Sequence, residues 1–157
     1  MSPLAIRPAT VADAEAAARV LTASITQLCD ADHHGDPAAI AHWVANKTPE
    51  AVAAMIAAGG MMVAERDGQV VGVGAIDPAQ GWITLNYVAP EVRGTGVSTA
   101  LLGAMEAALA AAGTVTARVK STMTARDFYA ARGWRATGPG QAGRWIDAVP
   151  MEKRLRP

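Results

Sequence analysis

A strand–turn–strand signal in the middle of the chain constrains the fold more than any other feature. Apolar and β-branched residues in segments 61–66 and 69–76 flank Asp67-Gly68, a dipeptide that favours the two-residue turn of a β-hairpin. Segment 82–88 predicts a further strand, which ends before Pro90. Consecutive hairpins exclude a plain doubly wound parallel sheet, so we expect an α/β fold of mixed pairing.

Helical segments surround these strands. Apolar side chains recur at helical spacing over residues 11–30, behind a capping-box-like pair formed by Thr10 and Asp13. Shorter helices are expected over residues 37–45 and 49–58, after a polar loop. The other expected elements are strands over residues 5–7 and 115–119, one or two strands over residues 144–155, and helices after Gly96 and over residues 124–132.

These elements predict an α/β (α+β) fold with a mixed, mostly antiparallel central sheet of six to seven strands, flanked by about four helices. Neither a repeat nor a linker-like stretch interrupts residues 3–156, so we expect a single domain. The net charge is zero, with 14 basic and 14 acidic residues. A nucleic-acid-binding protein normally carries a basic excess, so we expect no nucleic-acid partner.

The sequence also bears on location. The most apolar stretch, residues 99–115, is interrupted by Glu106 and glycine and is shorter than the about 20 residues that span a membrane. The first residues show no basic region followed by an apolar run. The chain has one cysteine, Cys29, which suits a reducing compartment. We therefore expect a soluble, cytoplasmic protein without a membrane partner.

A glycine-rich turn follows strand 82–88 and precedes a helix. Free N–H groups at a helix start bind anions, and Gly94 and Gly96 let a phosphate approach the backbone. The pattern excludes a nucleoside-triphosphate loop, because the required lysine is missing. It also excludes a dinucleotide turn, because Thr99 replaces the third glycine and residues 114–120 contain no acid. A glycine-capped turn without a ligand is the alternative.

The run from Arg93 to Ser98 resembles the Arg/Gln-x-x-Gly-x-Gly/Ala signature of the GNAT superfamily of N-acetyltransferases, with Ser98 at the last small position. Residues 125–134 resemble the late helix of that family, with Thr122 where asparagine is common and Trp134 where phenylalanine is common. The resemblance implies acetyl-CoA as cosubstrate and no metal. The residues that it implies for the coenzyme are Tyr87, Val88, Arg93, Gly94, Thr95, Gly96, Val97, Ser98, Thr99, Thr122 and Tyr129.

The resemblance further implies direct attack of an amine on the thioester, with Tyr129 as the general acid that donates to the sulfur. Residues 81–89 contain no acidic side chain, so the general base stays open. One alternative is a water molecule held by Thr84 or Asn86. The other is the polar segment after the first helix.

That segment contains Asp30, Asp32, His33 and His34. Asp32 and His33 are candidates for the base or for contacts to the acceptor, because histidine titrates near neutral pH and the segment resembles the acceptor-side loop of the family. A plain solvated loop is the second interpretation. A metal site is the third, although adjacent histidines form a poor ligand set.

The leading interpretation is therefore an acetyl-CoA-dependent N-acetyltransferase. A non-catalytic CoA-binding regulatory module and a homodimeric interaction module with an empty turn are the alternatives. The acceptor is a small-molecule or protein amine that the sequence does not identify, and the resemblance allows a homodimer.

Overall fold

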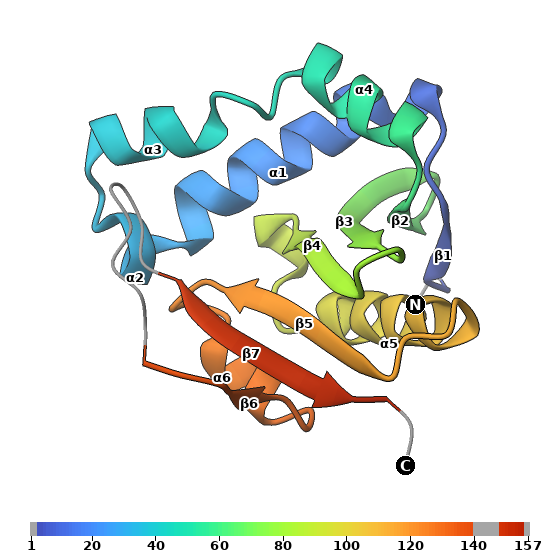
Figure 1. Ribbon diagram of the computed structural model, residues 1–157. Coiled ribbons are helices and arrows are strands. Elements are labelled where there is room, and N and C mark those ends of the chain that lie inside the picture. Colours follow the sequence, from blue (N-terminus) through green and yellow to red (C-terminus); the bar gives the residue numbers. More distant parts are fainter. Residues whose placement is uncertain (1–2, 140–147, 156–157) are drawn as a thin grey trace.

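The computed structural model describes residues 3–139 and 148–155. Within them, the centre of the molecule is a seven-stranded sheet with the strand order β1-β2-β3-β4-β5-β7-β6. Figure 1 shows the strands crossing the molecule between two groups of helices. The strands are β1 (Ala5–Pro8), β2 (Met61–Arg66), β3 (Gln69–Asp77), β4 (Trp82–Val88), β5 (Thr116–Ser121), β6 (Arg135–Ala136) and β7 (Val149–Arg154).

One neighbouring pair in this sheet is parallel. β4 and β5 run in the same direction, whereas the other neighbours are antiparallel. The parallel ladder is short and joins Trp82 to Arg118 and Ile83 to Val119. β4 stays paired with β3 as far as Val88. On its other side, β4 is no longer paired with β5 after Ile83, so the two strands separate and leave a gap in the sheet.

Helices cover both faces of the sheet. Helix α1 contacts β3 and β4 and packs on α3 and α4, while α5 contacts β1 to β4. Figure 1 shows α1, α3 and α4 above β2, β3 and β4, and α5 below these three strands. The helices are α1 (Ala14–Leu28), α2 (Asp30–His33), α3 (Pro37–Val44), α4 (Pro49–Ala58), α5 (Val97–Ala111) and α6 (Arg126–Ala130), with 3-10 turns η1 (Val11–Asp13) and η2 (Pro90–Val92).

Two glycines of β3 allow α5 to lie close to the sheet. A Cβ atom added at Gly72 would lie 2.8 Å from Cδ1 of Leu101, and one at Gly74 would lie 2.9 Å from Sδ of Met105. Leu101 and Met105 are fully buried in the core on this side. Because α5 begins at the glycine turn, this packing fixes the position of the turn beside β4.

The predicted fold class is confirmed, as is the hairpin at Asp67 and Gly68, whose φ angles are 54° and 73°. Among the described residues the α-helices number six, not about four, because α2 and α6 are little more than one turn each. β6 was not predicted, since two residues carry no periodic pattern. Residues 144–147 of the predicted C-terminal strands lie outside the described residues.

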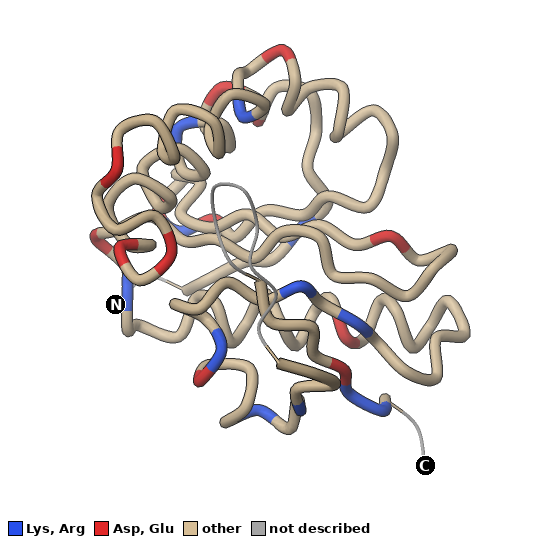
Figure 2. Tube along the Cα trace, turned by 60° about the vertical axis from the view of Figure 1, so that its left-hand side comes forward, with Lys and Arg blue, Asp and Glu red and all other residues tan. Residues whose placement is uncertain are grey.

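The predicted helix over residues 11–30 is divided. It begins as the 3-10 turn η1, continues as α1 to Leu28, and is followed by α2 inside the segment expected to be a loop. Asp32 and His33 of α2 are buried, which a solvated loop would not allow. None of the helices in the described parts of the chain has the length and apolar character needed to span a membrane. Figure 2 shows acidic and basic residues in both halves of the molecule.

An ion-pair cluster joins β1, η1 and β2. The guanidinium of Arg7 donates to both carboxylate oxygens of Asp13, at 2.8 and 2.9 Å, and to Glu65 at 2.8 Å. The same Asp13 carboxylate accepts the backbone N–H of Thr10 at 2.8 Å and so caps η1. The hydrogen bond from Arg7 is the main reason that the pKa of Asp13 falls from 3.8 to about 2.

We expect Asp13→Asn to lower the free energy of unfolding at pH 7 by about 1–2 kcal/mol; the half-exposed Arg7 reduces the value that the pKa shift alone implies. A carboxyl pKa that is lower in the folded than in the unfolded protein stabilises the fold at pH values above the unfolded pKa. The difference from the unmodified protein should therefore shrink as the pH falls from about 4 to about 2. Urea unfolding at several pH values measures it, with Asp127→Asn as control because that side chain is 92% exposed. A pH-independent difference would contradict the assignment.

Candidate functional site

A cavity of about 460 Å³ lies where the end of β4, the glycine turn and α6 meet. Four chain segments supply its walls: the end of α1, the end of β4, the turn with the start of α5, and residues 122–132. Ten of the eleven residues expected to bind the coenzyme line it, namely Tyr87, Val88, Arg93, Gly94, Gly96, Val97, Ser98, Thr99, Thr122 and Tyr129. The structure therefore brings the two separate sequence motifs to one cavity.

The glycine turn presents free backbone donors to this cavity. Gly96 is the N-cap of α5 with a φ of 92°, and Gly94 has a φ of 78°, a region that favours glycine. The first helical hydrogen bond runs from Ala100 N to Gly96 O, and no side chain caps the helix. The N–H groups of the first turn thus have no intrahelical partner and can bind an anion.

Thr95 is the exception among the expected cofactor residues. Its side chain is exposed, and its hydroxyl donates to the carbonyl of Val92 at 2.6 Å. Its backbone N–H bonds the same carbonyl at 3.1 Å. Thr95 does not line the cavity, so we correct its predicted role: it holds the shape of the turn.

Arg132 is a cavity residue that the sequence analysis did not identify. Its guanidinium lies 3.9 Å from the ring centre of Phe128, and its Nε donates to the hydroxyl of Thr99 at 3.1 Å. With Arg93 it places a second cation on the cavity wall. Helical spacing could have revealed it, because it lies three residues after Tyr129 and so on a similar face of the helix.

Tyr129 lies at the inner end of the cavity. The side chain is 4% exposed and meets the rings of Phe128 and Trp134 edge to face, with centroids 5.3 and 5.5 Å apart. Burial raises the pKa of Tyr129 to about 12, although a hydrogen bond from Asn86 acts in the opposite direction. The phenol is therefore protonated at neutral pH. A protonated phenol can donate its O–H in a hydrogen bond.

A second, smaller cavity of about 40 Å³ occupies the gap between β4 and β5. Its walls are residues 83–87 and 119–122, with Ala125 and Tyr129. Five residues line both cavities: Asn86, Tyr87, Thr122, Ala125 and Tyr129. The Oδ1 atom of Asn86 is buried and has no hydrogen-bond partner among the described residues. The gap therefore joins two spaces, with Tyr129 and an unsatisfied acceptor at their meeting point.

Asp32 and His33 do not line either cavity. The Asp32 carboxylate is 3% exposed and accepts the N–H of Met123 at 2.5 Å, the N–H of Thr124 at 3.2 Å and the hydroxyl of Thr124 at 2.5 Å. It thereby ties α2 to the segment between β5 and α6. The structure gives Asp32 a structural task in place of the expected base or acceptor contact.

The two ring nitrogens of His33 also have hydrogen-bond partners within the protein. Its Nδ1 accepts the N–H of Gly35 at 3.0 Å, and its Nε2 lies 2.9 Å from the carbonyl of Ile25. Both ring nitrogens therefore have backbone partners and are not directed at a ligand. In residues 3–139 and 148–155, no group of three or more His, Cys, Asp or Glu side chains is arranged to hold a metal ion.

Comparison with known proteins agrees with this geometry. The sequence matches the family model of the acetyltransferase (GNAT) domain over residues 17–155. The chain therefore belongs to the GNAT family of acetyltransferases. No curated protein matches the chain in sequence.

Solved structures with this fold cover almost the whole chain. A GCN5-related N-acetyltransferase structure from Rhodopseudomonas palustris is 29% identical, with a TM-score of 0.87 over 98% of this chain and 97% of its own. The PaiA N-acetyltransferase of Thermoplasma acidophilum, in complex with coenzyme A, is 17% identical, with a TM-score of 0.77 over 97% and 99%. YncA of Salmonella typhimurium, solved with acetyl-CoA, is 20% identical, with a TM-score of 0.69 over 99% and 96%.

Replacing Asp32 with alanine should destabilise the protein, because it leaves two backbone N–H groups and one hydroxyl without their acceptor. We expect the free energy of unfolding to fall by about 2–4 kcal/mol. The matched control is Asp30→Ala, whose side chain is 82% exposed and which should change stability by less than about 0.5 kcal/mol. Urea unfolding compares the two variants. An Asp32→Ala protein as stable as the unmodified one would contradict the structural role.

Proposed function

We propose that this GNAT protein is an N-acetyltransferase that moves the acetyl group of acetyl-CoA to a primary amine by direct attack. One observation carries the proposal: two cavities meet in the β4–β5 gap, and Tyr129 and Asn86 line both. The larger cavity begins at an anion-binding helix start. A cosubstrate with a diphosphate and a long arm can therefore enter from one side while the amine enters from the other.

The larger cavity suits coenzyme A. Its diphosphate would lie on the free N–H groups of Val97, Ser98 and Thr99, with Arg93 and Arg132 supplying positive charge. The pantetheine arm would run along the edge of β4 that faces the gap. That edge has lost its ladder to β5 after Ile83, so its backbone groups are available to the arm and to the thioester carbonyl.

The amine must lose a proton as it attacks, and neither cavity is lined by a carboxylate. We assign its orientation to Asn86, whose buried Oδ1 has no partner among the described residues and can accept an N–H from the amine. The proton would then leave through water in the smaller cavity, where Thr84 and Asn86 are wall residues. This proton-transfer scheme follows the water-relay alternative and gives no role to Asp32 or His33.

Tyr129 would act on the leaving group. Its O–H stays protonated because its pKa is about 12, and it can donate to the sulfur as the C–S bond breaks. A thiol with an ordinary pKa of about 8.5 is the stronger acid. The hydrogen bond therefore stabilises the departing thiolate, which takes up a proton from water after the amine has released its own proton through the smaller cavity.

Cys29 takes no covalent part in this scheme. It lines the larger cavity, but burial raises the pKa of its thiol to about 12. The thiolate, which is the nucleophilic form, is therefore scarce at neutral pH. Direct transfer from the thioester to the amine needs no acyl-cysteine intermediate.

Tyr129→Phe keeps the ring packing and removes the O–H donor. We expect kcat to fall by about 10²-fold, with little change in KM for acetyl-CoA, because the bond to sulfur forms in the transition state. In the unmodified enzyme, ionisation of Tyr129 should cause no loss of rate below about pH 11. Steady-state kinetics with a panel of primary amines measures both. An unchanged kcat removes Tyr129 from the mechanism, and binding of the coenzyme without turnover of any amine would favour a non-catalytic module.

Gly96→Ala tests the turn, because a non-glycine residue at a φ of 92° strains the backbone by about 1–2 kcal/mol. We expect affinity for coenzyme A to fall at least about tenfold as the donors move. The control is Gly103→Ala in α5, where an added Cβ meets nothing within 4 Å. It should stabilise the protein by about 0.5–1 kcal/mol and leave affinity unchanged. Calorimetric titration with coenzyme A compares them, and equal affinities would contradict the site.

A further inference from the structure

Lys47 is a buried cation for which residues 3–139 and 148–155 supply no counter-ion. It follows α3 and is 9% exposed. Its ammonium donates to the neutral side-chain oxygen of Asn46 at 2.5 Å, and no carboxylate in the described parts of the chain forms an ion pair with it. Burial lowers its pKa. A buried charge is unfavourable unless an opposite charge joins it, so the site favours an anion.

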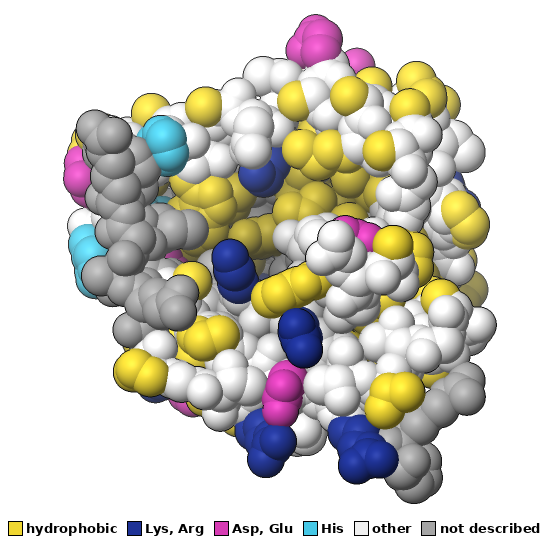
Figure 3. Space-filling model, in the orientation of Figure 1, with side chains coloured by type: hydrophobic (Ala, Val, Ile, Leu, Met, Phe, Trp, Pro, Cys, Tyr) yellow, Lys and Arg dark blue, Asp and Glu magenta, His cyan; other side chains and the backbone are white. Residues whose placement is uncertain are grey.

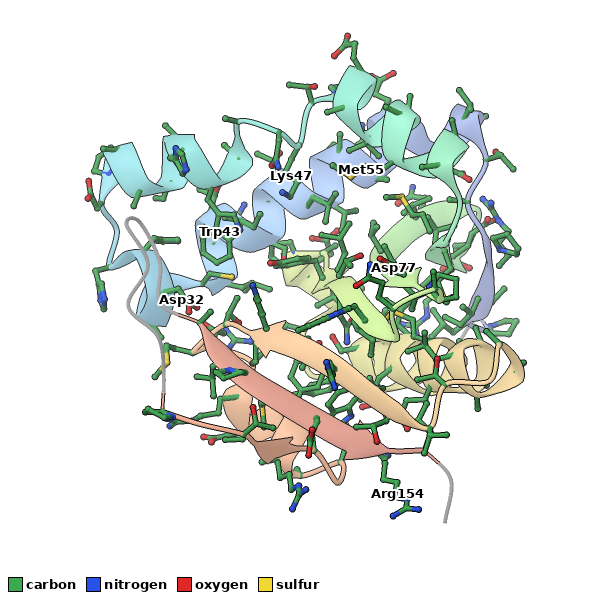
Figure 4. All side chains as sticks on the ribbon, viewed as in Figure 1. Asp32, Trp43, Lys47, Met55, Asp77 and Arg154 are labelled. Atoms are coloured by element: carbon green, nitrogen blue, oxygen red, sulfur yellow. The ribbon has the colours of Figure 1, made fainter. Side chains whose placement is uncertain are left out.

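Lys47 does not itself line the smaller cavity, but the chain segment that carries it contacts a residue that does. Trp43 of α3, one helical turn earlier in the chain, donates a hydrogen bond to the hydroxyl of Tyr87, which lines that cavity. Figure 4 shows Trp43 and Lys47 directed from α3 and the following connection toward the space in front of β4. Figure 3 shows this face of the molecule hollowed there, with hydrophobic side chains on the floor and Lys or Arg at the edge. We give the name front hollow to this depression together with the smaller cavity, whose walls include Tyr87 and Lys120; Trp43 and Lys47 are directed toward it.

Other charges around the front hollow do not neutralise Lys47. Lys120 lines the smaller cavity from the exposed face of β5 and lies 6.0 Å from the ring centre of Trp82. Asp77, labelled in Figure 4 on the other side of β4, accepts the N–H of Gln80 at 3.3 Å and so caps its own turn. Two cations therefore border the hollow, and the buried one has no anionic partner among the described residues.

We propose that Lys47 binds a carboxylate of the acceptor, so that the amine substrate is a small anionic amine of the α-amino-acid type. This inference rests on the proposed acetyl transfer. The amine would enter the gap toward Asn86, and the carboxylate would stay in the front hollow with Lys47. The smaller cavity, of about 40 Å³, has room for the reacting end of such a molecule and not for a folded chain.

The test compares pairs of acceptors that differ in one charge. Acetyl transfer is measured for the twenty standard L-amino acids and for the carboxamide of each amino acid that reacts. The unmodified enzyme should prefer the acids. In Lys47→Met the ratio of kcat/KM for acid over amide should fall at least about tenfold, because a charge-assisted hydrogen bond is lost. The acid-over-amide ratio of the variant is compared with that of the unmodified enzyme. This comparison cancels the difference in amine basicity between an acid and its amide.

Two control variants distinguish specific recognition of the carboxylate by Lys47 from a general effect of positive charge. Lys47→Arg should keep a larger part of the preference than Lys47→Met. Arg118→Met removes an exposed cation of β5 that lines neither cavity. It should change the ratio by no more than about twofold, because solvent screens that charge. An equal effect of Lys47→Met and Arg118→Met would overturn the assignment to Lys47.

The thermal stability of Lys47→Met distinguishes a ligand-binding role of Lys47 from a structural role. If Lys47 is kept for a ligand, Lys47→Met removes an uncompensated buried charge and should raise the thermal midpoint by a few degrees. A lower midpoint would mark Lys47 as structural and overturn the inference. Turnover of neutral amines alone would also overturn it and leave acetyl transfer intact. Absence of both turnover and coenzyme A binding would instead overturn the proposed function.

Discussion

The limited pairing of β4 with β5 is the constraint on which the rest of the structure depends. Two residue pairs hold these parallel strands together, at Trp82 and Ile83, and the strands then separate. A complete ladder would bury the backbone of β4 and close the sheet. Because the ladder stops, Asn86 and Tyr129 line a passage between two cavities, and the edge of β4 has backbone groups to offer a ligand. The sheet thus stabilises the fold and also forms the wall that the two cavities share.

The two sides of this passage are built differently. The coenzyme side uses a local device, a glycine turn followed by a helix start, and tight packing of α5 on Gly72 and Gly74 holds that device in place. The proposed acceptor side is assembled from distant segments, with α3 contributing Trp43 and β5 contributing Lys120. Under the proposed function, different residues contact the cosubstrate and the acceptor, so one GNAT fold can keep the first while the second changes.

The difference between locally encoded features and features assembled from distant segments explains what sequence analysis could predict. Periodicity and the Asp67-Gly68 turn predicted the sheet and most helices, because those signals are local. The turn residues were likewise found together in one cavity, except Thr95, whose outward orientation depends on its bond to Val92. Asp32 and His33 suggested acid–base chemistry by residue type and by the resemblance of their segment to the acceptor-side loop of the family. Their structural bonds to residues 123–124 and to Ile25 and Gly35 depend on tertiary packing, which the sequence pattern does not contain.

Backbone amide chemical shifts during a titration with acetyl-CoA test the central claim most directly. The account predicts that the largest changes occur at residues 94–99 and 86–88 and around Tyr129, since these segments form the walls of one cavity and Thr95 lies between two of its lining residues. Amides on the far side of the sheet, such as those of α4, should change little. Saturating acetyl-CoA that leaves residues 94–99 unchanged, or that perturbs a different face of the molecule, would contradict the account.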